Sequence, residues 1–114
     1  MLRNKTRVDL PEAALEALGN AERRRLVRAL GGGPKSVGEL AAGGSISRPA
    51  VSRHLAQLEQ AGLVMHNASG TRHIYALNPA GLDQTVAWLN GFWDEATARL
   101  KLVAENTKSG RRGG

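Results

Sequence analysis

The stretch SISRPAVSRHLAQLEQAGLV, residues 45–64, decides the fold of this chain. Val51, Leu55 and Leu58 recur at i, i+4 and i+7, so they lie on one face of a helix. Gly62 follows as a helix stop. The opposite face carries short hydroxyl groups and arginines, where a solvated helix usually carries a mixture of Glu and Lys. This composition predicts a helix with one packed face and one face shaped to fit a groove.

The N-terminal end of this helix is suited to meet a phosphate. Ser47 has the side chain of an N-cap, and Pro49 falls in the first turn, where its missing N–H is harmless. The free backbone N–H groups of a first turn and the helix dipole favour an anion. At 100° per residue, the residues at this end or away from the packed face are small, hydroxylic or basic: Ser47, Arg48, Pro49, Ser52, Arg53 and Ala56.

The remaining elements lie on both sides of this helix. Caps, glycine stops and hydrophobic spacing predict three helices before it, a β-hairpin directly after it and a long amphipathic helix at the end. Asn20 is the expected cap of the second helix, and Ser36 with Glu39 has the spacing of a capping box at the start of the third. Two short helices joined by a glycine-containing turn and followed by a hairpin form a winged helix-turn-helix. The predicted fold is mainly α with a small β-hairpin and an additional helix at each end. The expected ranges are 9–18, 20–30, 36–42, 47–61, 64–77 for the hairpin and 80–105 for the last helix.

The length and the charge suggest one basic domain. A chain of 114 residues favours a single domain, which we expect over 9–105, with a flexible basic N-terminus over 1–8 and a disordered basic tail over 106–114. The net charge is +6, and the positive charge gathers in the front half and at the two ends. The N-terminus has no apolar segment of a secretory signal, and no apolar run reaches the length of a membrane span. A soluble intracellular protein is therefore expected.

These features together predict binding to double-stranded DNA. In a helix-turn-helix the N-terminal part of the second helix enters the major groove, where arginine can donate two hydrogen bonds to guanine. An arginine beside a wing tip commonly meets the DNA backbone or the minor groove. On an isolated helix the same residues would fit a solvated surface, but their place between a turn and a hairpin favours DNA. The predicted DNA-binding residues are Ser47, Arg48, Pro49, Ser52, Arg53, Gln57, Thr71, Arg72 and His73.

Neither catalysis nor metal binding is predicted. The chain has no cysteine, and it offers no Ser-His-Asp set, paired-carboxylate cleft or phosphate-binding glycine loop, so we expect no catalytic residues and no cofactor. His66 and His73 could face each other across the hairpin, but a metal site needs about four ligands and no third is evident. His54 lies near the edge of the core, where a structural role or a phosphate contact is expected.

The last helix concentrates large apolar side chains. Trp88, Phe92 and Trp93 are three of the four Phe, Trp and Tyr residues in the chain. Packing within one protomer is one interpretation, but a dimer interface is favoured because exposed apolar patches need a partner. A two-fold dimer would present two recognition helices to a pseudo-palindromic operator, an inverted repeat. The predicted interface residues are Leu15, Leu18, Trp88, Leu89, Phe92, Trp93, Ala96 and Leu100.

The chain resembles the ArsR family of bacterial winged-helix repressors over about residues 14–104. The segments that carry the resemblance are ALGNAERRRLVRAL, SVGELA, SRPAVSRHLAQLEQAGLV, GTRHIYAL and GLDQTVAWLNGFWDEATARL. The resemblance implies a homodimeric transcriptional repressor in the bacterial cytoplasm, on the nucleoid. It also implies that residues 47–61 form the DNA-reading helix, that 64–77 form the wing, and that the first and last helices form the dimer.

The chain departs from the metal-sensing members of that family. Where those members carry the motif ELCVCDL, this chain reads ELAAGGS, so Ala41 and Gly43 stand in the thiolate positions. The other common metal site uses Asp and His on the last helix, and that helix has no histidine here. The resemblance therefore implies the branch without evident metal ligands, whose members often regulate their own operon.

Two other functions remain open on the sequence alone. The chain could be a sensor repressor whose small ligand or metal binds between the terminal helices, which a thermal shift with that effector would reveal. It could instead be a winged-helix module that binds a protein, and salt-independent partner binding without operator selection would favour that function. The expected partners are double-stranded DNA and a second copy of the chain, with an unknown effector.

Overall fold

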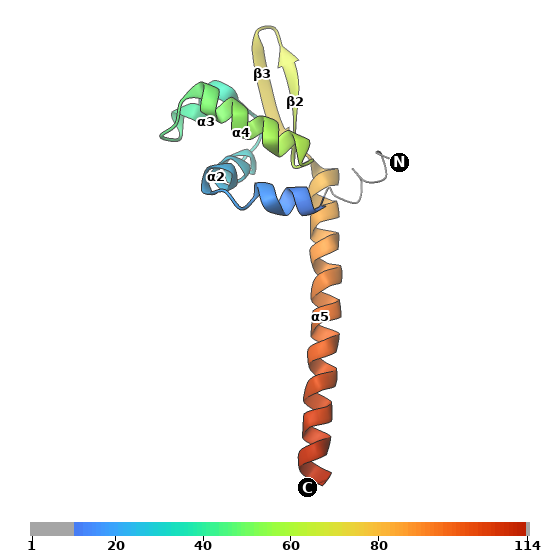
Figure 1. The fold of residues 1–114 in the computed structure, drawn as a ribbon. Coiled ribbons are helices and arrows are strands. Elements are labelled where there is room, and N and C mark those ends of the chain that lie inside the picture. The colour runs from blue at the N-terminus through green and yellow to red at the C-terminus, as the bar shows by residue number, and fades with distance from the viewer. Residues whose placement is uncertain (1–10, 114) are drawn as a thin grey trace.

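The computed structural model describes residues 11–113, and the side chains of residues 11–105. A body of short helices carries a hairpin wing on one side, and one long helix projects from it (Figure 1). The predicted residues 1–8 and the predicted helix start at residue 9 lie outside the described residues. The elements are helical residues 11–17, α2 (Ala21–Leu30), β1 (Lys35–Ser36), α3 (Val37–Ala42), α4 (Arg48–Gln60), β2 (Val64–Ser69), β3 (Arg72–Leu77) and α5 (Pro79–Gly113).

Three helices begin at the capping residues that the sequence predicted. Asn20, Ser36 and Ser47 each accept a hydrogen bond from the backbone N–H three residues further on, at 3.0, 3.1 and 3.3 Å. The carboxylate of Glu39 accepts a hydrogen bond from the backbone N–H of Ser36 at 2.8 Å, which completes a capping box. These caps determine where α2, α3 and α4 start, and hence the direction in which each helix points.

The apolar face of α4 forms the centre of the core. Val51, Leu55 and Leu58 are fully buried, as predicted. Each buried leucine contributes about 2 kcal/mol of hydrophobic stabilisation relative to an exposed one. The other large side chains that are fully buried come from α2, α3 and the start of the wing: Leu26, Leu40, Leu63 and Val64. The core therefore joins both helices of the helix-turn-helix to the base of the wing.

The predicted hairpin forms, and the structure adds a third strand. Ser69 lies opposite Arg72, so Gly70 and Thr71 make a two-residue turn in which Gly70 adopts a φ of +65°. The short strand β1 pairs with β3, which gives an antiparallel sheet of order β1-β3-β2. The sequence did not predict β1, because a strand of two residues has no periodicity and exists only through its partner.

The last helix is longer than predicted. The backbone of α5 continues to Gly113, whereas the sequence predicted a helix end near residue 105 and a disordered tail over 106–114. Residues 105–112 contain no proline and no adjacent pair of glycines, so nothing interrupts the series of i→i−4 hydrogen bonds. Among the described residues, no helix combines the length and the apolar character that a membrane crossing requires.

The helix α5 leaves the body at a contact between two glycines. Gly62, just after α4, adopts a φ of +81°. A Cβ atom at Gly81, in the first turns of α5, would overlap the carbonyl oxygen of Gly62. The backbone N–H of Asn78 donates to the carbonyl of Leu63 at 2.9 Å and holds the chain there. The direction of α5 therefore depends on the absence of a side chain at position 81.

We expect Gly81→Ala to lower the free energy of unfolding by about 3 kcal/mol, because the new methyl group would push α5 away from the end of α4. Urea unfolding followed by circular dichroism measures this change. Gly91→Ala is the matched control in the same helix: nothing lies within 4 Å of its Cβ position, so it should gain up to about 1 kcal/mol of helix propensity. Equal effects of the two substitutions would contradict the proposed backbone contact.

Candidate functional site

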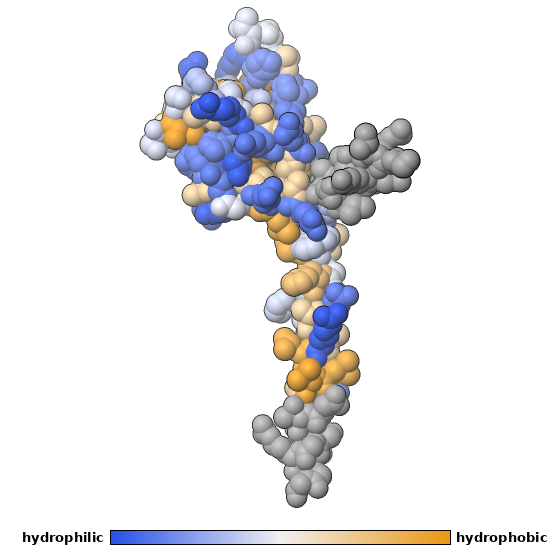
Figure 2. Space-filling view, in the orientation of Figure 1, coloured by the Kyte–Doolittle hydropathy of each residue, from blue (hydrophilic) through white to orange (hydrophobic). Residues whose placement is uncertain are grey.

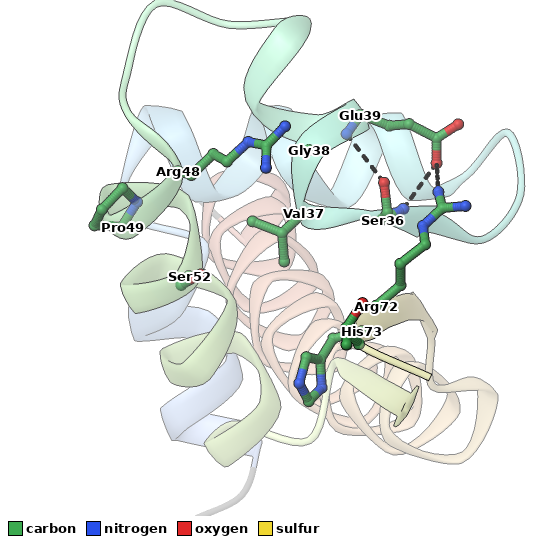
Figure 3. A pocket seen from close by; sticks show the side chains of 10 residues that line it. Ser36, Val37, Gly38, Glu39, Arg48, Pro49, Ser52, Arg72 and His73 are labelled. Carbon is green, nitrogen blue, oxygen red and sulfur yellow. Dashed lines mark hydrogen bonds and ion pairs between the residues drawn. The ribbon is translucent and has the colours of Figure 1, made fainter. Parts of the chain in front are cut away.

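A groove opens between the N-terminal ends of α3 and α4 and the tip of the wing (Figure 3). Its volume is about 660 Å³. The capped starts of α3 and α4 and the two-residue turn of the wing bring three separate stretches of the sequence to one place. The lining residues are Ser36, Val37, Gly38, Glu39, Arg48, Pro49, Ser52, Thr71, Arg72 and His73.

Most of the residues predicted to bind DNA gather in this groove. Six of them line it: Arg48, Pro49, Ser52, Thr71, Arg72 and His73. Ser47 is exposed at the end of α4, with its hydroxyl oxygen occupied as the N-cap. Arg53 is exposed on α4 but does not line the groove. The first turns of α4 and the wing tip thus present a shared basic surface.

The side chain of Gln57 is engaged elsewhere. Its amide oxygen accepts a hydrogen bond from the guanidinium of Arg23 on α2. The same guanidinium lies 3.4 Å from Nδ1 of His54 and donates from Nε to the carbonyl of Ala17 at 2.7 Å. Arg23 therefore ties the end of the first helix to α2 and α4. The sequence reasoning missed this role, since nothing in the run of arginines distinguishes Arg23 from its neighbours.

The guanidinium of Arg48 lies over Gly38 of α3. A Cβ atom at Gly38 would come 3.0 Å from Nη2 of Arg48 and 3.3 Å from its Cζ. Figure 3 shows the side chain of Arg48 directed from α4 toward this glycine. The absence of a side chain at position 38 therefore leaves the space in which Arg48 rests at the edge of the groove.

The groove also contains a carboxylate that the sequence predicted only as a helix cap. One oxygen of Glu39 accepts the capping hydrogen bond from Ser36 and lies 4.0 Å from the guanidinium of Arg72 (Figure 3). The backbone hydrogen bond from Ser36 is the main cause that lowers the pKa of Glu39 below its usual value, and the charges of Arg72 and Lys35 act in the same direction. No sequence signal could place this carboxylate beside the wing, because the two segments meet only in the fold.

The two histidines of the wing do not lie directly opposite each other, an arrangement that the sequence left open. His66 lies opposite Tyr75, and His73 lies opposite Ala68. The two imidazole centroids are 5.4 Å apart on the diagonal, and the Nδ1 atom of His66 lies 2.8 Å from a carboxylate oxygen of Glu59. The two-residue turn shifts the register by two positions from the one in which these histidines would face each other. Among the residues that the structure describes, no group of three or more His, Asp or Glu side chains could hold a metal ion.

The projecting part of α5 exposes apolar side chains along its length (Figure 2). Trp93 and Leu100 are 65% and 68% exposed, and the rings of Trp88 and Phe92 stack on each other at 5.9 Å. Leu18, also predicted at the dimer interface, is partly buried against the core. The exposed large apolar residues of this helix are Val86, Trp88, Leu89, Phe92, Trp93, Leu100, Leu102 and Val103.

Comparisons with known proteins agree with this geometry. Residues 18–67 match the model of a helix-turn-helix domain family. Over 94 residues the chain is 45% identical to the HTH-type transcriptional regulator Rv2034 of Mycobacterium tuberculosis. The alignment covers 82% of this chain and 88% of that protein. Over 77 residues it is 31% identical to the transcriptional repressor SdpR of Bacillus subtilis. This alignment covers 68% of this chain and 86% of that protein.

Solved structures give the same assignment. An ArsR-like transcriptional regulator from Rhodococcus sp. RHA1 superposes with a TM-score of 0.75 at 27% identity, covering 84% of this chain and 91% of that chain. The chain belongs to the ArsR family of winged helix-turn-helix transcriptional regulators. The homodimeric winged helix-turn-helix domain Mb0332 from Mycobacterium bovis shares the fold, with a TM-score of 0.64 at 24% identity, covering 83% of this chain and 88% of that chain.

Membership of the ArsR family gives the elements their roles. The relatives are transcriptional regulators and the family is not enzymatic, so this chain is a DNA-binding transcriptional regulator and not an enzyme. In this ArsR-family fold, α3 and α4 form the helix-turn-helix and β2 with β3 forms the wing. The groove thus lies between the helix-turn-helix and the wing.

We expect Gly38→Ala to weaken binding to specific DNA by about 1 kcal/mol, because the methyl group displaces the guanidinium of Arg48 while α3 stays folded. A double-mutant cycle with Arg48→Ala, read by fluorescence anisotropy, tests this expectation. In the Arg48→Ala background the additional substitution should have no further effect. Fully additive losses would show that Gly38 acts independently of Arg48.

Proposed function

We propose that this protein is a homodimeric repressor that binds an inverted-repeat operator. The observation that carries the proposal is the shared basic surface formed by the first turns of α4 and the wing tip. A repressor is named among the relatives, and the exposed face of α5 supplies a surface for a second copy. Since a regulator works where the DNA is, the proposal also locates it in the bacterial cytoplasm, on the nucleoid.

In this proposal the predicted DNA-binding residues divide the work of recognition. Arg48, Ser52 and Arg53 meet base edges or position α4 in the major groove, where an arginine can bind O6 and N7 of guanine together. Ser47, next to the free N–H groups of the first turn of α4, meets a phosphate. Thr71, Arg72 and His73 bring the wing against the adjacent backbone or minor groove, while Pro49 allows a close approach and Gln57 supports α4 through Arg23.

The apolar face of α5 has the spacing of a helix pair. Its large residues are separated alternately by four and three positions, which is the pattern of a heptad seam. A monomer would leave these side chains in water, and a second copy of the same helix offers the same complementary face. The homodimeric fold relative supports this arrangement. The seam positions are Val86, Leu89, Trp93, Ala96, Leu100 and Val103, while Leu82, which has the same spacing, packs against the core of its own protomer.

We also propose that regulation does not depend on a metal at α3, and that the protein controls its own operon as that branch of the family often does. Ala41 and Gly43 stand where metal-sensing members carry thiolates. The guanidinium of Arg25 lies beside Gly43 and Gly44, and it is held by Glu22 at 2.7 Å and by the carbonyl of Leu40 at 3.3 Å. A fixed positive charge at that place opposes the binding of a metal cation.

The operator can be found by selecting random duplexes on the purified protein at about 150 mM salt, where contacts to phosphate alone are weak. We expect an enriched inverted repeat, because a two-fold dimer presents two copies of α4. Selection of a single unrepeated site would contradict the dimer. Retention of DNA only at low salt, with no enriched sequence, would contradict specific regulation.

Arg53→Ala should weaken binding to the selected repeat by about 1–3 kcal/mol and relax the preference for one base pair in each half-site, if Arg53 binds guanine. Repeating the selection with the variant measures both effects. Lys101→Ala removes the same charge from α5 and should leave the preference unchanged. A loss of similar size on every sequence would make Arg53 a phosphate contact instead.

Trp93→Ala should shift the protein toward monomers, because a side chain that is 65% exposed in one protomer packs against the second copy in the dimer. Sedimentation equilibrium measures the dissociation constant, which should rise at least about tenfold. Thr97→Ala, one turn further on and outside the seam, should leave it unchanged. Wild-type protein that sediments as a monomer at micromolar concentration would overturn the dimer.

A further inference from the structure

The carboxylate of Glu39 is the one acidic group among the side chains that line the groove between α3, α4 and the wing. It is 60% exposed, and it lies 4.0 Å from the guanidinium of Arg72, which is 63% exposed. Arg48 and Arg72 are the basic side chains of the same groove. The carboxylate thus lies beside the guanidinium of Arg72, which the proposed function brings against the DNA backbone.

The fold of α3 does not require that charge. In a capping box the residue three positions after the cap accepts a hydrogen bond from the cap backbone, and glutamine serves this purpose as well as glutamate. The hydrogen bond from Ser36 uses one oxygen of Glu39, and the same oxygen is the one nearest to Arg72. The start of α3 therefore favours a negative charge at position 39 without requiring one, since glutamine would accept the same hydrogen bond.

We propose that Glu39 is a specificity-determining residue, which pairs with the wing arginine Arg72 in the free protein and withholds it from DNA of random sequence. This inference rests on the proposed function, since it assigns a role within the same DNA-binding surface. Glu39 is the part of the surface that weakens binding to the wrong sequences.

The physical basis is the way in which DNA attracts cations. Binding to random sequence comes almost entirely from lysine and arginine side chains that replace counterions on phosphates. An arginine that is paired with a carboxylate adds less to this attraction, because it must leave its partner first. On the operator, base contacts made by α4 hold the wing in one position, and a phosphate there can separate Arg72 from Glu39. The ion pair thus lowers random binding more than operator binding.

The ionisation of Glu39 agrees with this role. The hydrogen bond from the backbone of Ser36 is the largest cause that lowers its pKa, and the charges of Arg72 and Lys35 lower it further. The group is consequently a carboxylate throughout the neutral range, in which the protein meets DNA.

The test compares wild-type protein, Glu39→Gln, Arg72→Ala and the double variant on two duplexes of equal length. One duplex carries the selected inverted repeat, and the other carries the same bases in scrambled order. Affinities are measured by fluorescence anisotropy between about 50 and 200 mM salt. Glu39→Gln should bind the scrambled duplex more tightly, with a salt slope steeper by about 0.9 per protomer, while the slope on the repeat stays the same. The gain should therefore be larger at the lowest salt than at the highest by about threefold for each protomer, which is about twelvefold for a dimer.

The double variant and a charge control identify the cause. In the Arg72→Ala background, Glu39→Gln should gain nothing on the scrambled duplex. Glu12→Gln removes an equal charge from the first helix, and it should change neither slope. A gain that persists without Arg72, a gain of equal size on both duplexes, or no gain at all would each overturn the inference.

The single variant Arg72→Ala provides a second test of the inference, and it leaves the capping box of α3 intact. With Glu39 present, this variant should reduce the slope on the repeat by about 0.9 per protomer and leave the slope on the scrambled duplex unchanged. An equal reduction on both duplexes would overturn the inference. The proposed function is judged separately, on the wild-type protein: if it does not prefer the repeat, the proposed function fails, whatever the variants do.

Discussion

The burial of one face of α4 is the interaction on which the rest of the structure depends. Val51, Leu55 and Leu58 are fully buried, and through them α4 contacts the core that α2, α3 and the base of the wing share. Burial of this face leaves the opposite face of the same helix exposed. A rotation of α4 by one residue would turn its basic and hydroxylic side chains toward the core at the cost of several kcal/mol. The orientation of the proposed DNA-binding face is thus a consequence of core packing.

The arginines of α2 show how charge supports this arrangement away from DNA. Arg23 links α4 to the end of the first helix, Arg24 donates to the carbonyl of Leu18 at 2.8 Å, and Arg25 donates to the carbonyl of Leu40 near the end of α3 at 3.3 Å. These side chains satisfy backbone carbonyls at the C-terminal ends of two helices, where hydrogen-bond partners are scarce. Much of the positive charge in the front half therefore stabilises the fold, and the surface that meets DNA carries only part of it.

The two proposed interfaces of the protein differ in their physics. The groove is polar and open, and the carboxylate of Glu39 partly neutralises the arginines that line it. In the proposed mechanism, sequence recognition at the groove therefore depends on whether Arg72 is paired with Glu39 or free to bind a phosphate. The face of α5 is apolar and continuous, and its contribution scales with the area that a second copy would cover. The contact between Gly62 and Gly81 connects them, because it sets the angle between the DNA-binding body and the helix that would carry the partner.

Local signals in the sequence determined most of the elements. Asn20, Ser36 and Ser47 start helices, and Gly70 makes the wing turn, because capping and a positive φ depend on one residue and its near neighbours. The spacing of Val51, Leu55 and Leu58 likewise identified the buried face of α4, since a helical period can be read from the sequence without knowledge of the partner elements.

Other features were decided only by the tertiary structure. The strand β1 exists through its pairing with β3, and the wing register was settled by the turn, which is why His66 meets Tyr75 and Glu59 instead of facing His73. The same holds for the pairing of Glu39 with Arg72, whose segments are joined by the whole of α4 and half of the wing. By itself the sequence determined which helices form and which of their faces are apolar, because those properties arise within one element. The composition of the groove was decided by packing, because it depends on which ends of separate elements the shared core brings together.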